Sequence, residues 1–437
     1  MSLLLPPAGG NTSGPAKPVP RCSTKSGDPS FLSEAQSNKK MTETSPATGL
    51  LLTGGGARAA YQVGVLEAIA EMRRAAGPAA GTGNPFPVIT GTSAGAINAA
   101  ALACGADNFD HVVAHIAQVW GNFHAEQVYR ADSLSVIGSG ARWRTLLGFG
   151  RFAANWMRVK PKSLLDNAPL ADLLQRMVPL DRLPQLMQAG HVQALAVTGS
   201  SYSSGEHVTF FEAAVPMEPW VRSQRLSVRD RITHHHLLAS SAIPFVFPAT
   251  ALPMQGHTEY FGDGSMRQSA PIAAAIHLGA QRILVIGAGR MHEPRETDAP
   301  NTHSGYPTMA QIAGHALSSI FLDALAVDIE RLRRINHTLG LIPEEVRASS
   351  SLRPLDLLVI SPSERLDAIA ARHVDSLPGA VRHLLGGSKV AADVKGSALA
   401  SYLLFESGYT RELMALGRAD AMKQREEVLR FFGWNAA

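Results

Sequence analysis

The stretch GTSAGAINAA at residues 91–100 places Ser93 between two glycines, Gly91 and Gly95, after a β-branched run and before an alanine-rich helix. A G-x-S-x-G turn from strand to helix holds a serine in strained backbone geometry, and its glycines let neighbouring backbone approach closely. The hydroxyl would then lie near the positive end of the following helix, where developing negative charge is favoured. A helix start capped by serine gives the same pattern, so the motif by itself leaves both interpretations open.

A second candidate is the glycine-rich stretch TGGGARAAYQVGVL at residues 53–66, which follows an expected strand and opens a helix. Backbone N–H groups in such a loop are ready to hold an anion. A dinucleotide site is disfavoured, because no strand ending in Asp or Glu follows about 20 residues later. We interpret the loop as an oxyanion hole formed by Gly54, Gly55 and Gly56 with Arg58 nearby. A purely structural loop, with Arg58 in a salt bridge, is the alternative.

A third candidate is Asp263, followed by Gly264 in the stretch YFGDGSMRQSAP at residues 260–271. Asp-Gly is a common turn signal, so this pair alone indicates a hairpin more readily than a site. Its importance comes from its combination with the two motifs before it.

Together the three motifs resemble those of the patatin-like phospholipases, which carry a glycine-rich loop, then G-x-S-x-G, then Asp-Gly followed by a small residue. The stretch ASSAIPFVFPA at residues 239–249 is also similar to this family. Ala59 in place of the last loop glycine and Ser265 after Asp-Gly depart from the pattern, but both are small. The resemblance covers residues 48–280 well.

The resemblance implies a catalytic dyad in which Asp263 accepts the proton of Ser93 directly, with no histidine between them. The reaction would be transfer of an acyl group to water through an acyl-serine intermediate. Because an aspartate has a reference pKa of about 3.9, such a base needs a short hydrogen bond and a partly desolvated site to act near neutral pH. The acyl ester could be a phospholipid, a lysophospholipid, an acylglycerol or a thioester.

Two other functions stay open. One is an α/β-hydrolase esterase with a Ser-Asp-His triad, which the histidines after Asp263 could complete: His277, His292, His303, His315, His337, His373 and His383. The other is a non-catalytic lipid-binding protein on the same fold.

No metal or cofactor is expected. His111 and His115 stand four residues apart, but the glutamate that a zinc-protease helix carries beside its first histidine is missing. The histidine run at residues 233–241 is better explained by core or solvated histidines.

The elements that must position these motifs alternate between strands and helices. Short apolar runs predict strands at residues 49–53, 86–90, 192–199, 207–212, 282–288 and 356–361, of which the third and fourth could form a hairpin. Helical periodicity predicts helices at 57–76, from 94 onward, at 309–337 and at 398–432. This order predicts a three-layer α/β/α sandwich with a mainly parallel central sheet.

The domain organisation follows from composition. Residues 1–47 are rich in Pro, Gly, Ser and Thr and predict a disordered N-terminal tail, whose extent depends on whether Met1 or Met41 is the start. We expect the catalytic domain at 48–280. The segment 281–437 is expected to continue it with helices and a further strand packed on the same domain.

The overall composition of the 437 residues, 45% hydrophobic and 17% charged, is that of a globular protein. A formal charge of +4 gives no dense basic face, so we expect no nucleic-acid partner.

Only Cys22 and Cys104 are present, and no run reaches the length of about 18 apolar residues that spans a bilayer, so we expect a cytoplasmic protein. Interleaved arginines and aromatics at 141–160 suggest either peripheral membrane contact or a partly buried helical subdomain.

Overall fold

The computed structural model describes residues 47–130, 163–266, 268–289, 309–350, 352–384 and 397–434. They belong to one compact unit, Pro46–Ala437. The expected tail, apart from residue 47, and the segment 141–160 lie outside the described residues.

A ten-stranded mixed sheet forms the centre of this unit, in the order β10-β9-β1-β2-β3-β4-β6-β5, with β8 paired to both β3 and β7. Strands β10, β9, β1, β2 and β3 run parallel, whereas β4 and β8 are antiparallel to β3. The strands are β1 Thr48–Leu52, β2 Val88–Thr92, β3 Ala194–Ser201, β4 His207–Ala213, β5 Val221–Arg222, β6 Arg225–Arg229, β7 Thr250–Met254, β8 His257–Asp263, β9 Arg282–Ile286 and β10 Asp356–Ile360.

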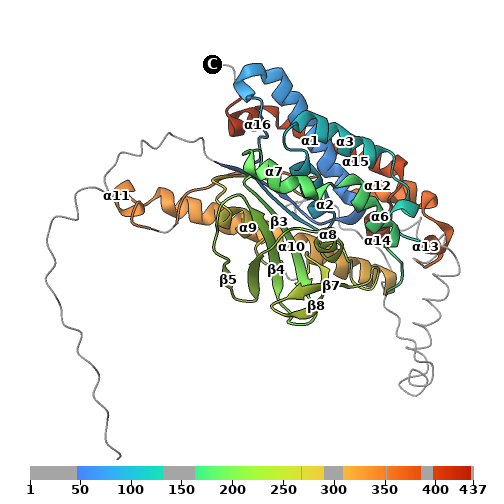
Figure 1. Cartoon of the computed structure of the whole chain (residues 1–437). Coiled ribbons are helices and arrows are strands. Elements are labelled where there is room, and N and C mark those ends of the chain that lie inside the picture. Colours follow the sequence, from blue (N-terminus) through green and yellow to red (C-terminus); the bar gives the residue numbers. More distant parts are fainter. Residues whose placement is uncertain are drawn as a thin grey trace, which may run out of the picture. The chain divides into compact units, whose positions relative to one another are not determined.

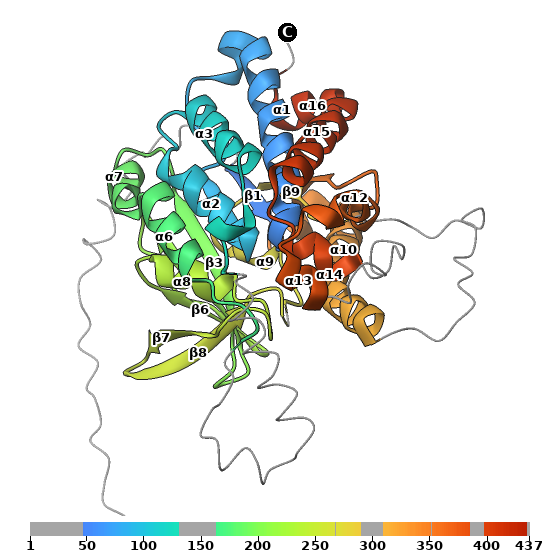
Figure 2. The same ribbon diagram turned by 90° about the vertical axis from the view of Figure 1, so that its right-hand side faces the viewer.

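Helices cover both faces of the sheet, as Figures 1 and 2 show. On one face lie α1 (Ala60–Ala76), α2 (Ala94–Cys104), α3 (Phe109–Gly121), α12 (Leu366–His373), α14 (Ser397–Leu403) and α15 (Ser407–Lys423). On the other lie α9 (Ala273–His277) and α10 (Met309–Gly340). The expected three-layer α/β/α sandwich is therefore confirmed.

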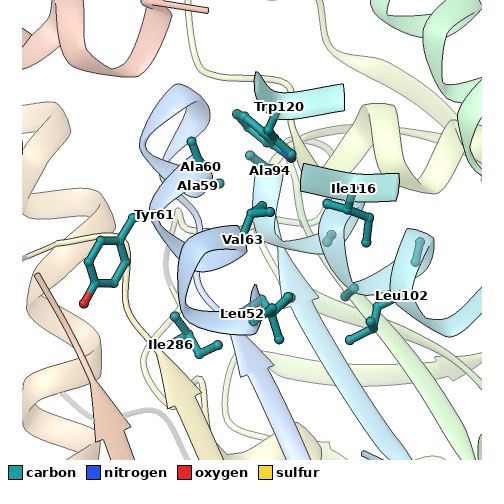
Figure 3. Close-up of a cluster of buried hydrophobic side chains, with 14 of the residues drawn as sticks. Leu52, Ala59, Ala60, Tyr61, Val63, Ala94, Leu102, Ile116, Trp120 and Ile286 are labelled. Atoms are coloured by element: carbon teal, nitrogen blue, oxygen red, sulfur yellow. The ribbon is translucent and has the colours of Figure 1, made fainter. Parts of the chain in front are cut away.

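Alternation along the central strands explains these layers. In β1, Leu50 and Leu52 point to the α1 side, while Leu51 between them points to the α9 side. Successive side chains of a strand point to opposite faces, so an all-apolar strand is stable only when both faces are covered. Figure 3 shows part of the core on the α1 side, which includes Leu52 and Ile286 from the sheet, Val63 of α1 and Leu102 of α2.

The remaining helices are short. They are the 3-10 helices η2 (Gly56–Ala59), η3 (Gly77–Ala80), η4 (Ala125–Gln127), η5 (Leu180–Arg182) and η6 (Val374–Ser376), and the α-helices α6 (Ala168–Met177), α7 (Leu183–Gln188), α8 (His234–Ser240), α11 (Glu344–Arg347), α13 (Gly379–Leu384) and α16 (Arg425–Phe432). In the part of the chain that the structure describes, every helix is too short or too polar to cross a membrane.

All six predicted strands form, within about two residues at each end, and the predicted hairpin is the antiparallel pair β3–β4. Sequence reasoning missed β5 to β8, and it was wrong about the helix at 398–432. That segment breaks twice, at residues 404–406 between α14 and α15 and at Gln424 between α15 and α16. The first break has a tertiary cause, because Phe405 turns into the core against Trp120 and Phe123.

Helices α1 and α15 pack in unusually close contact, side by side in Figure 2. A Cβ atom added at Gly64 of α1 would lie 1.9 Å from the carbonyl oxygen of Met414 in α15. Backbone atoms cannot yield as a flexible side chain can, so an added methyl group would push the helices apart.

We therefore predict that Gly64→Ala lowers the free energy of unfolding by about 2 kcal/mol or more, as overpacking of a dense core does. Urea unfolding measures this. The matched control is Gly83→Ala, where no atom lies within 4 Å of the added carbon, and it should change stability by less than about 0.5 kcal/mol. Equal effects of the two substitutions would contradict the close packing of α1 on α15.

Candidate active site

Ser93 occupies the turn between β2 and α2, with φ 56° and ψ −132°. This conformation is strained for a residue other than glycine, and such strain persists only where the surroundings impose it. Part of the constraint is a hydrogen bond of 2.8 Å that the Ser93 N–H donates to Ser240 Oγ. The turn places Ser93 at the N-terminus of α2, where the helix dipole favours negative charge.

The two glycines of the motif allow the turn to pack against its neighbours. A Cβ atom at Gly95 would lie 2.4 Å from the carbonyl oxygen of Leu52, at the end of β1. One at Gly91 would lie 2.5 Å from the carbonyl oxygen of Gly95 itself. The small residues around Ser93 thus let the start of α2 touch the end of β1, which leads into the glycine-rich loop.

Asp263 ends β8 and is brought to Ser93 by the sheet. Strand β8 pairs with β3, where Asp263 lies opposite Gly199, and β3 in turn is the neighbour of β2. Ser93 Oγ donates a hydrogen bond of 2.5 Å to Asp263 Oδ2, and the Ser265 N–H donates one of 2.8 Å to Asp263 Oδ1. A serine and a carboxylate 170 residues apart are therefore in direct contact.

Burial changes the acidity of Asp263. Its side chain has no exposed surface, and loss of hydration raises its pKa from 3.8 to about 6, against the opposing effect of the hydrogen bonds from Ser93 and Ser265. Desolvation disfavours the charged form of a carboxyl group and so makes it a better base. At pH 7 the group is mostly ionised and can accept a proton.

The segment 240–242, at the C-terminal end of α8, connects the turn at Ser93 to the turn at Asp263. Besides the hydroxyl that receives the Ser93 N–H, the carbonyl oxygen of Ser240 accepts from the Gly264 N–H at 3.1 Å, and that of Ala242 accepts from the Asp263 N–H at 2.9 Å. Sequence analysis noted this stretch only for its family likeness. Its hydrogen bonds show that Ser240 holds Ser93 and the residue after Asp263, while Ala242 holds Asp263 itself.

The glycine-rich loop lies beside Ser93. Gly54 and Gly55 are buried in the loop between β1 and η2, and Gly56 lines the same cavity as Ser93. The Arg58 side chain, expected near the oxyanion hole, points elsewhere: Arg58 Nε donates a hydrogen bond of 2.7 Å to Ser401 Oγ, and Arg58 does not line this cavity.

A cavity of about 300 Å³ begins at Ser93 and Gly56. It is at the lower end of the range for ligand pockets, about 300 to 1,000 Å³. Its floor is one face of α2 from Ala94 to Cys104, and its walls come from α3, α6 and the segment after α14. The main apolar lining is Ile97, Ala101, Val112, Ile116, Val119, Trp120, Phe123, Leu170, Leu173, Leu174, Ile243, Phe247 and Phe405.

A buried polar network fixes the floor of this cavity to the loop. Trp120 Nε1 donates to Asn98 Oδ1 at 2.8 Å, and Asn98 Nδ2 donates to Gln62 Oε1 at 3.1 Å. Gln62 Nε2 in turn donates to the carbonyl oxygen of Thr53 at 2.7 Å. Nothing in the sequence singled out Gln62 or Asn98, because a polar residue inside an alanine-rich helix carries no local signal of its partners.

No histidine in the described part of the chain hydrogen-bonds to Ser93 or Asp263. His277 stacks on Trp220 and His373 pairs with Glu412, while His337 lies exposed on α10. His292 and His303, and the side chains of His315 and His383, lie outside the described residues. His207, which the sequence did not single out, is buried on β4, and burial lowers its pKa to about 4.

The other histidines singled out in the sequence have structural positions. His236 is buried, and its ring contacts Thr233 at the start of α8. His111 and His115 are exposed on α3 at the edge of the cavity. In the ranges that the structure describes, no group of three or more His, Cys, Asp or Glu side chains could hold a metal ion.

The patatin-like phospholipase family matches residues 50–276, just over half of the chain. The chain belongs to this family, as its three motifs suggested, and family membership supports a lipid acyl hydrolase. The solved structure of VipD from Legionella pneumophila is similar at 14% sequence identity and a TM-score of 0.30, over 72% of this chain and 61% of that one. The chain thus spans less than two thirds of the VipD structure. No curated protein sequence matches it.

The pKa of Asp263 predicts a pH dependence of any reaction in which it acts as a base. A base must be unprotonated, so kcat/KM for a soluble ester should be level above pH 7 and fall about tenfold per pH unit below the pKa of about 6. Initial rates between pH 4.5 and 8, with circular dichroism at each pH to verify folding, measure this. A rate that stays level down to pH 5 would exclude Asp263 as the base.

Proposed function

We propose that this protein hydrolyses lipid acyl esters, with Ser93 as the nucleophile and Asp263 as the general base. The observation that carries the proposal is the 2.5 Å hydrogen bond from Ser93 Oγ to the buried Asp263 carboxylate, at the end of an apolar cavity. A nucleophile within hydrogen-bond reach of its base, next to a pocket for an apolar substrate, is the arrangement that acyl transfer requires.

In the first half of the reaction, Asp263 takes the proton of Ser93 Oγ while that oxygen attacks the ester carbonyl carbon. The tetrahedral intermediate then collapses, the bond to the alcohol oxygen breaks, and the alcohol leaves with the proton from Asp263. In the second half, water gives a proton to Asp263 and attacks the acyl-serine. Ser93 recovers that proton, and the carboxylic acid is released.

The negative oxygen of the intermediate needs donors that are fixed before the reaction starts. The backbone N–H groups of Gly55 and Gly56 are our candidates, because Gly56 shares the cavity with Ser93. The N-terminus of α2 adds a favourable dipole at the same place.

The acyl chain would lie along α2. This helix has 11 residues, so the part of the cavity that runs along it, here called the groove, is about 16 Å long at 1.5 Å per residue. Its lining is overwhelmingly apolar, which suits a hydrocarbon chain with its carbonyl group at Ser93. The polar headgroup would then project from the Ser93 end.

The first test replaces the two proposed reacting groups. Ser93→Ala and Asp263→Asn should each remove nearly all hydrolysis of a p-nitrophenyl acyl ester while circular dichroism stays unchanged. A fluorophosphonate probe should label the wild-type protein at Ser93 and leave Ser93→Ala unlabelled. A folded wild-type protein that neither hydrolyses esters nor takes the label would favour a lipid-binding protein. Full activity in Asp263→Asn would exclude Asp263 as the base.

The second test concerns the groove. Ala101→Phe places a ring on its floor, so kcat/KM for a long-chain ester should fall at least about tenfold relative to a short-chain ester. The matched control is Ala114→Phe, on the exposed face of α3 and outside the cavity lining, which should leave the ratio unchanged. If Ala101→Phe lowers hydrolysis of both esters equally, the acyl chain lies elsewhere.

A further inference from the structure

The C-terminal region contacts the glycine-rich loop directly. Arg58 Nε donates to Ser401 Oγ at 2.7 Å, and the guanidinium carbon of Arg58 lies 4.1 Å from the ring centroid of Tyr402. A guanidinium group over an aromatic face is attracted by the ring, most strongly away from water. Arg58 and Ser401 are 5% and 0% exposed, so both interactions are shielded from solvent.

Backbone contact reinforces these interactions. Gly56 has φ +54°, and a Cβ atom added to it would lie 2.4 Å from the carbonyl oxygen of Tyr402. The residue that lines the cavity beside Ser93 is therefore packed against α14 on its other side. This close approach couples the position of Gly56 to that of the Tyr402 backbone.

The end of α14 and the break that follows it are held beside the cavity. Tyr129 donates a hydrogen bond of 2.9 Å to the carbonyl oxygen of Leu403, and Phe405 lines the cavity. The Glu406 carboxylate accepts from the Ala125 N–H at 3.1 Å. The break between α14 and α15 is thus fixed to the segment that follows α3.

Arg58 could instead act on the substrate directly. The geometry argues against this, since its Nε is engaged by Ser401, its side chain is buried against Tyr402, and it does not line the cavity. Its effect on the reaction would pass through the backbone of the loop that contains it.

We propose that residues 401–406, outside the family-matched range 50–276, position the glycine-rich loop through Arg58 and so complete the active site. Arg58, Ser401 and Tyr402 are positioning residues, and the inference rests on the proposed acyl hydrolase. Loss of the Ser401 hydroxyl would leave a buried guanidinium N–H without its partner, and the loop would rearrange to satisfy it. Misplaced oxyanion donors lower the rate of the chemical step more than they weaken substrate binding.

The test compares variants of this contact with a matched control. Ser401→Ala and Tyr402→Leu should each lower kcat for a soluble short-chain ester by about tenfold or more, with KM changed by less than about twofold. Tyr402→Phe keeps the ring and should restore most of the rate. The control is Thr410→Val, which removes another buried hydrogen bond between the C-terminal region and the rest of the domain, from Thr410 Oγ1 to the carbonyl oxygen of Trp120. It should lower the melting temperature and leave kcat unchanged.

Amide hydrogen exchange at residues 54–59 gives a second measurement that does not depend on activity. Exchange in this loop should be faster in Ser401→Ala and Tyr402→Leu than in the wild-type protein, and unchanged in Thr410→Val. If either variant fails to fold, Arg58→Lys, which keeps the charge but loses the Nε donor, should show the same loss of kcat and the same faster exchange.

The contradicting outcomes are distinct. If Ser401→Ala and Tyr402→Leu lower the melting temperature as Thr410→Val does, but leave kcat and loop exchange unchanged, the contact is purely structural. A raised KM with constant kcat would show that Arg58 binds substrate. A wild-type protein that hydrolyses no ester and takes no fluorophosphonate label would overturn the proposed function, and the exchange data would still decide whether residues 401–406 hold the loop.

Discussion

The 2.5 Å hydrogen bond between Ser93 and Asp263 depends on a carboxylate kept away from water. Raising the pKa of Asp263 from 3.8 to about 6 corresponds to about 3 kcal/mol of unfavourable free energy, at about 1.4 kcal/mol per pH unit. The sign follows from linkage: a carboxyl group with a raised pKa in the folded state imposes no cost below pH 3.8 and its full cost above pH 6. The rest of the fold must offset this cost.

The sheet and segment 240–242 hold this arrangement in place. Strand β3 lies between β2, which leads to Ser93, and β8, which ends in Asp263, so the strand ladder sets the backbone positions of both residues. Ser240 receives the N–H groups of both Ser93 and Gly264. The strained backbone conformation of Ser93 persists because these hydrogen bonds and the close contact of Gly95 with β1 both impose it.

The part of the chain after the family-matched range is integral to this domain. Strand β9, at residues 282–286, pairs with β1, which leads into the glycine-rich loop. Without it β1 would be the edge strand of the sheet, with unpaired backbone groups. Helix α15 packs on α1 at the Gly64–Met414 contact, so the far end of the sequence supports the elements that carry the first two motifs.

The sequence by itself determined the features that depend on short-range patterns. Apolar runs predicted the six strands, and the glycine spacing around Ser93 and the Asp263–Gly264 pair indicated the family and the residues that meet in the structure. Strand β8 escaped prediction because it is half exposed and mixed in pattern, so its stability comes from pairing with β3 and β7. The partner of Arg58, the break at residues 404–406 and the groove along α2 were decided only by tertiary structure. Each depends on contacts between residues far apart in the chain, such as Arg58 and Ser401, which no local periodicity encodes.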